Sequence, residues 1–146
     1  TRLLYDVSHN IAKIETHDID GRSCKCCVHR KGATRAMPGQ PVLVPGDMGT
    51  GSWLLEGAAG NRAFASSCHG AGRLLSRSAA KKNIDGRAVQ RELQSRGIRV
   101  HANTPNIMSE EAPGAYKDVD EVIRLSNSAG LTKPIARLSP LAVIKG

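Results

Sequence analysis

The residues best suited to carry out chemistry lie between Ser66 and Arg77, where His69 is followed by Gly70 and Gly72. Apolar residues before this stretch and a helix-like pattern from Leu74 to Lys82 predict a strand-to-helix turn at the histidine. Glycines let a backbone approach a ligand closely, and a helix N-terminus attracts phosphate. The pattern predicts a phosphate-handling site with a nucleophile or acid–base group. A glycine-rich turn around a buried histidine explains the same residues equally well.

The same stretch contains two arginines, Arg73 and Arg77, which lie four residues apart. In the predicted helix both side chains would lie on one face. One guanidinium group can donate two hydrogen bonds to the oxygens of a phosphate. Two arginines on one face therefore favour an anionic ligand.

A second glycine-rich segment runs from Pro45 to Ser52 and contains three glycines. It lacks the Gly-Lys-Ser/Thr ending of a Walker A loop, which excludes that class of nucleotide site. Free N–H groups in such a turn can still hold a phosphate or a base edge.

Several single residues admit two interpretations. His9 fits a surface or capping histidine and also a metal ligand, since imidazole binds manganese, iron and zinc. Tyr116, just before the helix expected after Asp118, fits a half-buried core residue. Lys145 fits a solvated charge near the terminus. Cys24, Cys26 and Cys27 have C-x-C-C spacing, which favours free, mostly buried thiols in a reducing cytoplasm over a zinc site.

The composition points towards a nucleic acid or nucleotide partner. The net charge is +8, and arginine outnumbers lysine among the 21 basic residues. Arginine bias favours bidentate phosphate contacts. The only aromatic residues are Tyr5, Trp53, Phe64 and Tyr116, too few for the base-stacking platform of single-strand binders. No apolar run is long enough to span a membrane, so we expect no membrane association.

The periodicity is compatible with one unit of short strands and three or four helices over residues 1–146. Helices are expected from Asp6 to about Thr16, after the N-cap Asp85 to about Arg96, and after Asp118 to about Ser128. Strands are expected at 23–30, 42–44, 53–55, 62–66 and 98–102, with one buried strand from Ile135 to Ile144.

Taken together, six sequence blocks resemble the RtcB family, the GTP-dependent RNA-splicing ligases. The most specific is Cys-His-Gly-Ala-Gly-Arg-x-x-Ser-Arg at residues 68–77. The others are His9 to Lys13, Val28 to Arg35, Pro45 to Thr50, Glu110 to Asp120, and the closing Lys145-Gly146. The resemblance covers almost the whole chain but only the C-terminal part of the family's catalytic domain. It implies a partial RtcB-type α+β fold.

The resemblance also implies roles for individual residues. His69 would be the nucleophile that becomes guanylylated by GTP, His9 would be a manganese ligand, and Arg73 and Arg77 would bind RNA or nucleotide phosphates. Residues expected to bind the guanine nucleotide are Pro45, Gly46, Asp47, Met48, Ser52, His69, Gly70, Ala71, Gly72, Tyr116 and Lys145. Asp47 replaces a serine found in many members, and its carboxylate would repel phosphate but can accept from guanine N–H groups.

The implied activity joins a 2′,3′-cyclic phosphate or 3′-phosphate RNA end to a 5′-hydroxyl end, in the cytoplasm. RNA, GTP, manganese and an archease-type activating protein are the implied partners. The family's other metal ligands, an Asp/Cys pair and two histidines, are absent, so we expect a missing N-terminal part. A chain starting at Thr1 fits a fragment, a split protein or a degenerate copy. Two alternatives stay open: a non-catalytic basic RNA-binding module derived from such a ligase, and a zinc protein.

Overall fold

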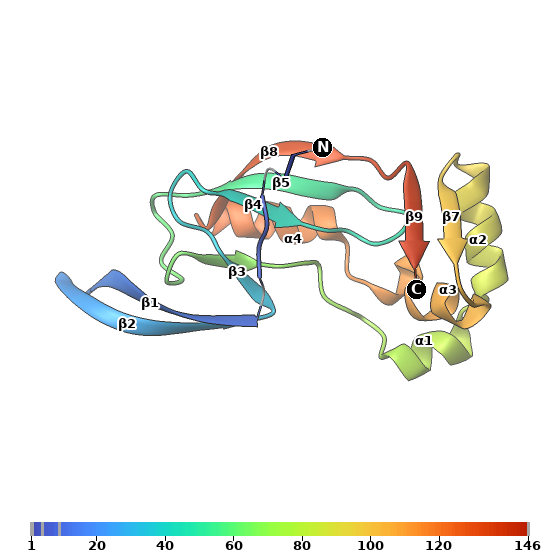
Figure 1. The fold of residues 1–146 in the computed structure, drawn as a ribbon, viewed down its shortest axis with the longest axis horizontal. Coiled ribbons are helices and arrows are strands. Elements are labelled where there is room, and N and C mark those ends of the chain that lie inside the picture. The colour runs from blue at the N-terminus through green and yellow to red at the C-terminus, as the bar shows by residue number, and fades with distance from the viewer. Residues whose placement is uncertain (1, 4, 9, 146) are drawn as a thin grey trace.

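The computed structural model describes residues 2–3, 5–8 and 10–145. Together they form an elongated arrangement (Figure 1). A β-hairpin forms one end, a small sheet lies in the middle, and most of the helices gather at the other end (Figure 1). The described residues contain four α-helices and nine strands, which confirms the α+β prediction.

The hairpin consists of β1 (Asn10–Ile19) and β2 (Arg22–Lys31), paired antiparallel along their whole length. The turn between them uses Asp20 and Gly21, both with positive φ. The predicted helix over residues 6–16 is therefore wrong. Its apolar residues are spaced like a helix, but pairing with β2 decides the backbone conformation, and Ile14 is left exposed.

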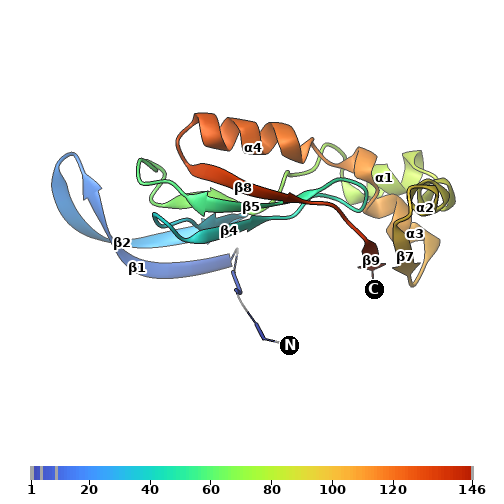
Figure 2. The same ribbon diagram turned by 90° about the horizontal axis from the view of Figure 1, so that it is seen from above.

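The central sheet has the order β4-β5-β8, formed by β4 (Pro41–Val44), β5 (Ser52–Gly57) and β8 (Thr132–Leu138). Helix α4 (Val119–Ser128) covers one face of it (Figure 2). Their contact forms the first core cluster, which contains Ala36, Val42, Val44, Leu55, Val119 and Ile123. A separate short pair joins β3 (Ala33–Arg35) to β6 (Ser66–Cys68).

The helical end contains α1 (Arg77–Asn83), α2 (Gly86–Ser95) and α3 (Pro105–Glu110), followed by the 3₁₀ turn η1 (Pro113–Ala115). Strand β7 (Arg99–Ala102) runs parallel to β9 (Ala142–Lys145) beside them. A second core cluster lies here, built from Met48, Leu93, Ile98 and Met108. The loop from Pro45 to Met48 therefore runs from the first core to the second.

Several predicted boundaries are confirmed by their caps. The side chain of Asp85 accepts a hydrogen bond from Arg87 N at the start of α2, and Asp118 accepts one from Asp120 N at the start of α4. Gly97 and Gly130 have positive φ just after those helices. The side chain of Glu121, in the first turn of α4, accepts two hydrogen bonds from Arg124.

Three other expectations are wrong. The strands expected at 53–55 and 62–66 do not pair with each other: residues 62–65 form a turn in which Phe64 and Ala65 have positive φ, and β5 pairs with β4 and β8. The helix expected from Leu74 begins only at Arg77, because Ser76 caps it. The strand expected at 135–144 is two strands separated by residues 139–141, with Ile135 and Ile144 exposed.

All four cysteines are free, as expected, although Cys27 is exposed and the other three are partly buried. Within the described residues, no helix has the length and apolar character needed to cross a membrane.

Candidate nucleotide site

His69 lies immediately after β6, in a loop that runs to the start of α1. The Cβ that an alanine at Gly32 would carry lies 3.7 Å from the imidazole, so the histidine packs against the residue that joins β2 to β3. The helix N-terminus expected beside His69 lies farther along, after Ser76. The helix dipole is therefore not adjacent to the histidine.

A cavity of about 420 Å³ collects most of the predicted nucleotide-binding residues. Its lining comes from the two glycine-rich loops, from the segment before α4 and from the end of β9. The lining residues are Pro45, Gly46, Asp47, Met48, His69, Gly70, Ala71, Gly72, Arg73, Glu111, Tyr116 and Lys145. Among the predicted nucleotide residues, only Ser52 lies outside this lining.

The loop after β4 is held by its own side chains. Asp47 Oδ1 accepts hydrogen bonds from Gly49 N and Thr50 N, both at 2.8 Å, and Ser52 Oγ accepts one from Gly46 N at 3.2 Å. A Cβ at Gly46 would lie 1.9 Å from the carbonyl oxygen of Gly51, so only glycine fits there. Asp47 and Ser52 thus fix the conformation that presents residues 45–48 to the cavity.

Ser52 lines a neighbouring, largely apolar cavity of about 510 Å³. Pro45 and His69 line both cavities, so the histidine lies between them. Trp53 and Leu138 are on the apolar side, where Trp53 also packs against the first core cluster, as expected for a packing residue. The Trp53 indole N–H donates to Asp120. The hydrogen bond from Arg137, and then that from Trp53, lower the pKa of the Asp120 carboxyl.

Backbone pairing brings Tyr116 to the glycine-rich loop. Arg73 and Tyr116 form an isolated antiparallel bridge, and Lys117 N donates to Gly72 O at 3.0 Å. Burial raises the pKa of Tyr116 to about 12, with a further contribution from its hydrogen bond to Glu111. The phenol therefore stays protonated and able to donate across the physiological pH range.

Arg73 uses its guanidinium inside the protein. Its Nε donates to Leu75 O at 2.9 Å, Nη1 donates to the Tyr116 hydroxyl at 2.7 Å, and Nη2 donates to Glu110 O. Because Arg73 precedes α1, it does not share a helix face with Arg77, which corrects that expectation.

Arg77 is more open, with a side chain that is 71% exposed. Its Nε lies 3.0 Å from Glu110 Oε1, and Lys81 Nζ lies 2.6 Å from Glu110 Oε2. These cations, led by the hydrogen bond from Lys81, lower the pKa of the Glu110 carboxyl. The three side chains form an ion-pair group between α1 and α3. This group adjoins the cavity lining at Glu111, because Arg77 Nε also lies 4.0 Å from Glu111 Oε1.

The described residues do not form a metal centre. His9, the predicted manganese ligand, lies outside them. Across residues 2–3, 5–8 and 10–145, no three His, Cys, Asp or Glu side chains come together as metal ligands. His29 and His101 are both exposed, on β2 and β7.

Residue-by-residue reasoning assigned no role to Glu111, although it lines the cavity and contacts Tyr116, Arg73 and Lys145. The only sequence signal was the position of Glu111 in the block from Glu110 to Asp120, because its partners are distant in the chain. Lys145 was also expected as part of a closing tail, whereas β9 pairs it with Ala102 of β7.

Comparison with known proteins identifies the family. The model for tRNA-splicing ligase RtcB matches residues 1–146. RNA-splicing ligase RtcB of Mycobacterium bovis is 53% identical over 99% of this chain, which spans 36% of that relative. tRNA-splicing ligase RtcB of Thermococcus kodakarensis is 50% identical, and the chain spans 33% of it. That of Pyrococcus horikoshii is 48% identical, and the chain spans 18% of it. This chain, about a third of the length of the first two relatives, belongs to the RtcB family of tRNA-splicing ligases.

Proposed function

We propose that this chain is the nucleotide-activating part of an RNA ligase that seals 2′,3′-cyclic phosphate or 3′-phosphate ends to 5′-hydroxyl ends. The observation that carries the proposal is the cavity in which His69 meets two glycine-rich loops, Tyr116 and Lys145. This set offers a nucleophile, backbone N–H groups, an aromatic face and a cation, which suits a purine nucleotide.

In the first proposed step, an imidazole nitrogen of His69 attacks the α-phosphorus of GTP. A nitrogen–phosphorus bond forms, the bond between the α-phosphorus and the bridging oxygen breaks, and pyrophosphate leaves. The resulting guanylylated histidine divides a difficult transfer into two easier ones. Residues 45–48 and 70–72 line the space around the nucleotide, and their backbone N–H groups can offset its negative charge.

In the later steps, the histidine returns to its starting state. Opening of a 2′,3′-cyclic phosphate by water gives an RNA 3′-phosphate. An oxygen of that phosphate attacks the guanylyl phosphorus, and the nitrogen–phosphorus bond breaks. The RNA 5′-hydroxyl then attacks the activated 3′-phosphate, forms the phosphodiester and releases GMP. Arg77, exposed at the cavity edge, is the better placed of the two arginines to contact RNA phosphates.

Manganese belongs to the proposal only as an ion bound by the complete ligase. When bound, it would withdraw charge from the nucleotide phosphates. His9 is its proposed ligand in this chain, and the remaining ligands would come from the rest of the ligase. The archease-type partner and the cytoplasmic location likewise remain predictions from the resemblance.

The test is covalent labelling of a complete ligase that carries this segment, using GTP labelled at the α-phosphate. We expect His69→Ala to abolish the label, because no other side chain can replace the nucleophile at that position. His29→Ala and His101→Ala are matched controls, since both histidines are exposed and line neither His69 cavity. Retained labelling in His69→Ala would overturn the assignment.

The same preparation separates the ligase from a basic RNA-binding module. A binding module holds RNA with equal affinity whether or not GTP and manganese are present, and it never becomes labelled. A ligase becomes labelled without RNA and transfers the label when RNA with a 3′-phosphate is added.

A further inference from the structure

The carboxylate of Glu111 is the meeting point of three side chains of the candidate nucleotide site, and Arg77 Nε lies farther from it, 4.0 Å from Oε1. The Tyr116 hydroxyl donates to its Oε2, Arg73 Nη1 donates to its Oε1 at 3.4 Å, and Lys145 Nζ lies 3.7 Å from its Oε2. The Glu111 side chain is only 19% exposed, so these contacts are partly shielded from solvent.

The three partners come from separate parts of the chain. Arg73 lies in the loop after β6, Tyr116 follows η1, and Lys145 ends β9. Glu111 directly follows α3, where its backbone N–H still donates to Ile107 O. The other acidic residue in the cavity lining, Asp47, uses its carboxylate oxygen for the N–H groups of its own loop. Glu111 is thus the acid in the lining that ties separate elements together.

These contacts determine how the Tyr116 ring is presented. The Arg73 guanidinium carbon lies 4.6 Å from the ring centroid, so Arg73 covers one face of the ring. Only the opposite face is available to a base. The hydroxyl is held between Arg73 Nη1 and Glu111, which fixes the orientation of the ring in its plane.

We propose that Glu111 is a positioning residue of the nucleotide site, which holds the Tyr116 ring, Arg73 and Lys145 in the arrangement that accepts the base. The inference rests on the proposed function of the cavity. Glu111 acts through its partners and does not itself react.

If Glu111 competed with the nucleotide for its cationic partners, the effect of neutralising Glu111 would have the opposite sign. A carboxylate that merely competed with the nucleotide for Arg73 and Lys145 would weaken binding, and its removal would free two cations. Neutralising Glu111 would then lower the KM for GTP. A positioning carboxylate, once neutralised, releases the tyrosine and both cations from their fixed places, and the KM for GTP rises.

The experiment compares Glu111→Gln with Glu110→Gln in a complete ligase carrying this segment, by following self-labelling against GTP concentration. Glu110 is the matched control because it pairs with Arg77 and Lys81 outside the cavity lining. We expect Glu111→Gln to raise the KM for GTP roughly tenfold, the scale of one lost charge-assisted hydrogen bond. The labelling rate at saturating GTP should change much less. Inhibition by added pyrophosphate should be unchanged, since it does not use the base contact.

A double-mutant cycle keeps the proposal testable if Glu111→Gln also affects folding. In a Tyr116→Phe background the hydroxyl is absent, so Glu111→Gln should add clearly less to the KM than it does in the wild type. A full, additive effect in that background, or a KM that is unchanged or lower in Glu111→Gln, overturns the inference. Absence of labelling in the wild-type enzyme would instead refute the proposed function, so the two failures are distinguishable.

Discussion

At the scale of single residues, the candidate site separates side chains that face a ligand from side chains that hold them. His69, Tyr116 and Lys145 line the cavity, while Ser52 and Asp47 hold the loop that forms one wall. Arg73 belongs to the second kind, because its N–H groups are used by Leu75, Tyr116 and the α3 end. The arginine motif thus contains one supporting residue and one exposed residue.

Lys145 should contribute to the choice of base. Its ammonium can donate to the O6 acceptor of guanine, whereas adenine carries a donor amino group at that position. We expect Lys145→Met to reduce the preference for GTP over ATP by roughly tenfold. The measurement is the ratio of labelling efficiencies with the two nucleotides. Lys133→Met, at an exposed position on β8, is the control. An unchanged ratio would make Lys145 a structural charge for β9 only.

Tyr116 should titrate late. Its pKa is raised to about 12, first by burial and then by the Glu111 hydrogen bond. The neutral phenol is favoured in the folded state, so its contribution to stability is complete below the ordinary pKa of 10. That contribution is lost as the pH rises from about 10 towards 12. Ultraviolet titration of tyrosinate in wild type and Tyr116→Phe isolates the Tyr116 transition, and a transition near pH 10 would contradict the buried geometry.

At the scale of elements, Arg30 joins the two strands of the hairpin by a buried ion pair and also ties the hairpin to β6, the strand that precedes His69. Arg30 donates to Glu15 Oε1 at 2.8 Å and Oε2 at 2.7 Å, and also to Ser66 Oγ at 2.9 Å. The side chains of Arg30 and Glu15 are 1% and 7% exposed. Arg30 also donates to the carbonyl oxygens of Phe64 and Ala65, the two consecutive residues with positive φ. The pair thus supports a strained turn just before β6.

Removing one member of this pair should be strongly destabilising. We expect Glu15→Gln to lower the free energy of unfolding by about 3 kcal/mol, because a buried guanidinium loses its counter-charge. Glu92→Gln, which breaks an exposed pair with Arg96, should change it by less than about 0.5 kcal/mol. Chemical denaturation of the complete ligase variants measures both. Equal changes in the free energy of unfolding would show that the buried Glu15–Arg30 pair stabilises the fold no more than an exposed pair.

The pH dependence of the same pair has a definite sign. The hydrogen bond from Arg30 lowers the pKa of Glu15 below its ordinary value of 4.5. The ionised form is favoured in the folded state, so this stabilisation is present above pH 4.5 and is lost as the pH falls through the lower folded value. Glu15→Gln should flatten that part of the stability curve.

Elements with local signals were predictable from sequence, and elements decided by distant partners were not. Asp85 and Asp118 cap their helices within the next residues, and Gly97 and Gly130 end them, so α2 and α4 followed from short-range chemistry. The helix predicted over most of β1 is wrong because the conformation of β1 depends on its pairing with β2, which the residues of β1 alone do not indicate. The run from Ile135 to Ile144 is divided near Pro140 into two strands. Its apolar residues follow no periodic pattern from which their exposure could be predicted.

The site divides in the same way. The cavity residues from residues 45–48, 69–72, 116 and 145 were anticipated from the family resemblance, and the fold brings them together. Glu111 was missed because its importance depends on three side chains distant in sequence. Arg73 and Arg77 do not share a helix face because α1 starts at Arg77, three residues after the expected start at Leu74.

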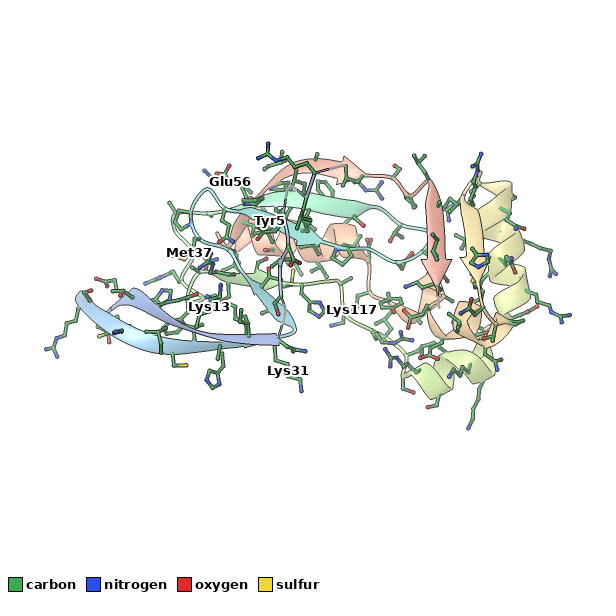
Figure 3. All side chains as sticks on the ribbon, in the orientation of Figure 1. Tyr5, Lys13, Lys31, Met37, Glu56 and Lys117 are labelled. Atoms are coloured by element: carbon green, nitrogen blue, oxygen red, sulfur yellow. The ribbon has the colours of Figure 1, made fainter. Side chains whose placement is uncertain are left out.

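At the scale of the molecule, the hairpin and the last strands leave much surface without cover. The hairpin extends away from the sheet (Figure 1), and it carries the labelled Lys13 and Lys31 (Figure 3). A two-stranded hairpin is marginal by itself, so packing partners matter for it. Large apolar side chains are exposed near the C-terminus, including Leu141 at 82% and Ile144 at 80%. The chain also spans only about a third of the first two relatives described.

These features predict that the 146-residue chain alone does not ligate RNA. It contains the proposed nucleophile, but the described residues bring no three metal-ligating side chains together, and a single imidazole such as His9 holds a divalent ion weakly. Exposed apolar surface should also make the isolated chain self-associate. Light scattering would detect that association as a mass above that of one chain.

The decisive assay incubates the purified chain with α-labelled GTP and manganese, then adds RNA with 2′,3′-cyclic phosphate and 5′-hydroxyl ends. We expect no sealed product and far less than one label per chain, because the α-phosphate keeps its charge against the approaching imidazole. A complete ligase carrying the same segment is the positive control, and its His69→Ala variant is the negative one. Stoichiometric labelling of His69, or any sealed RNA, from the isolated chain would show that the residues present suffice for the active site.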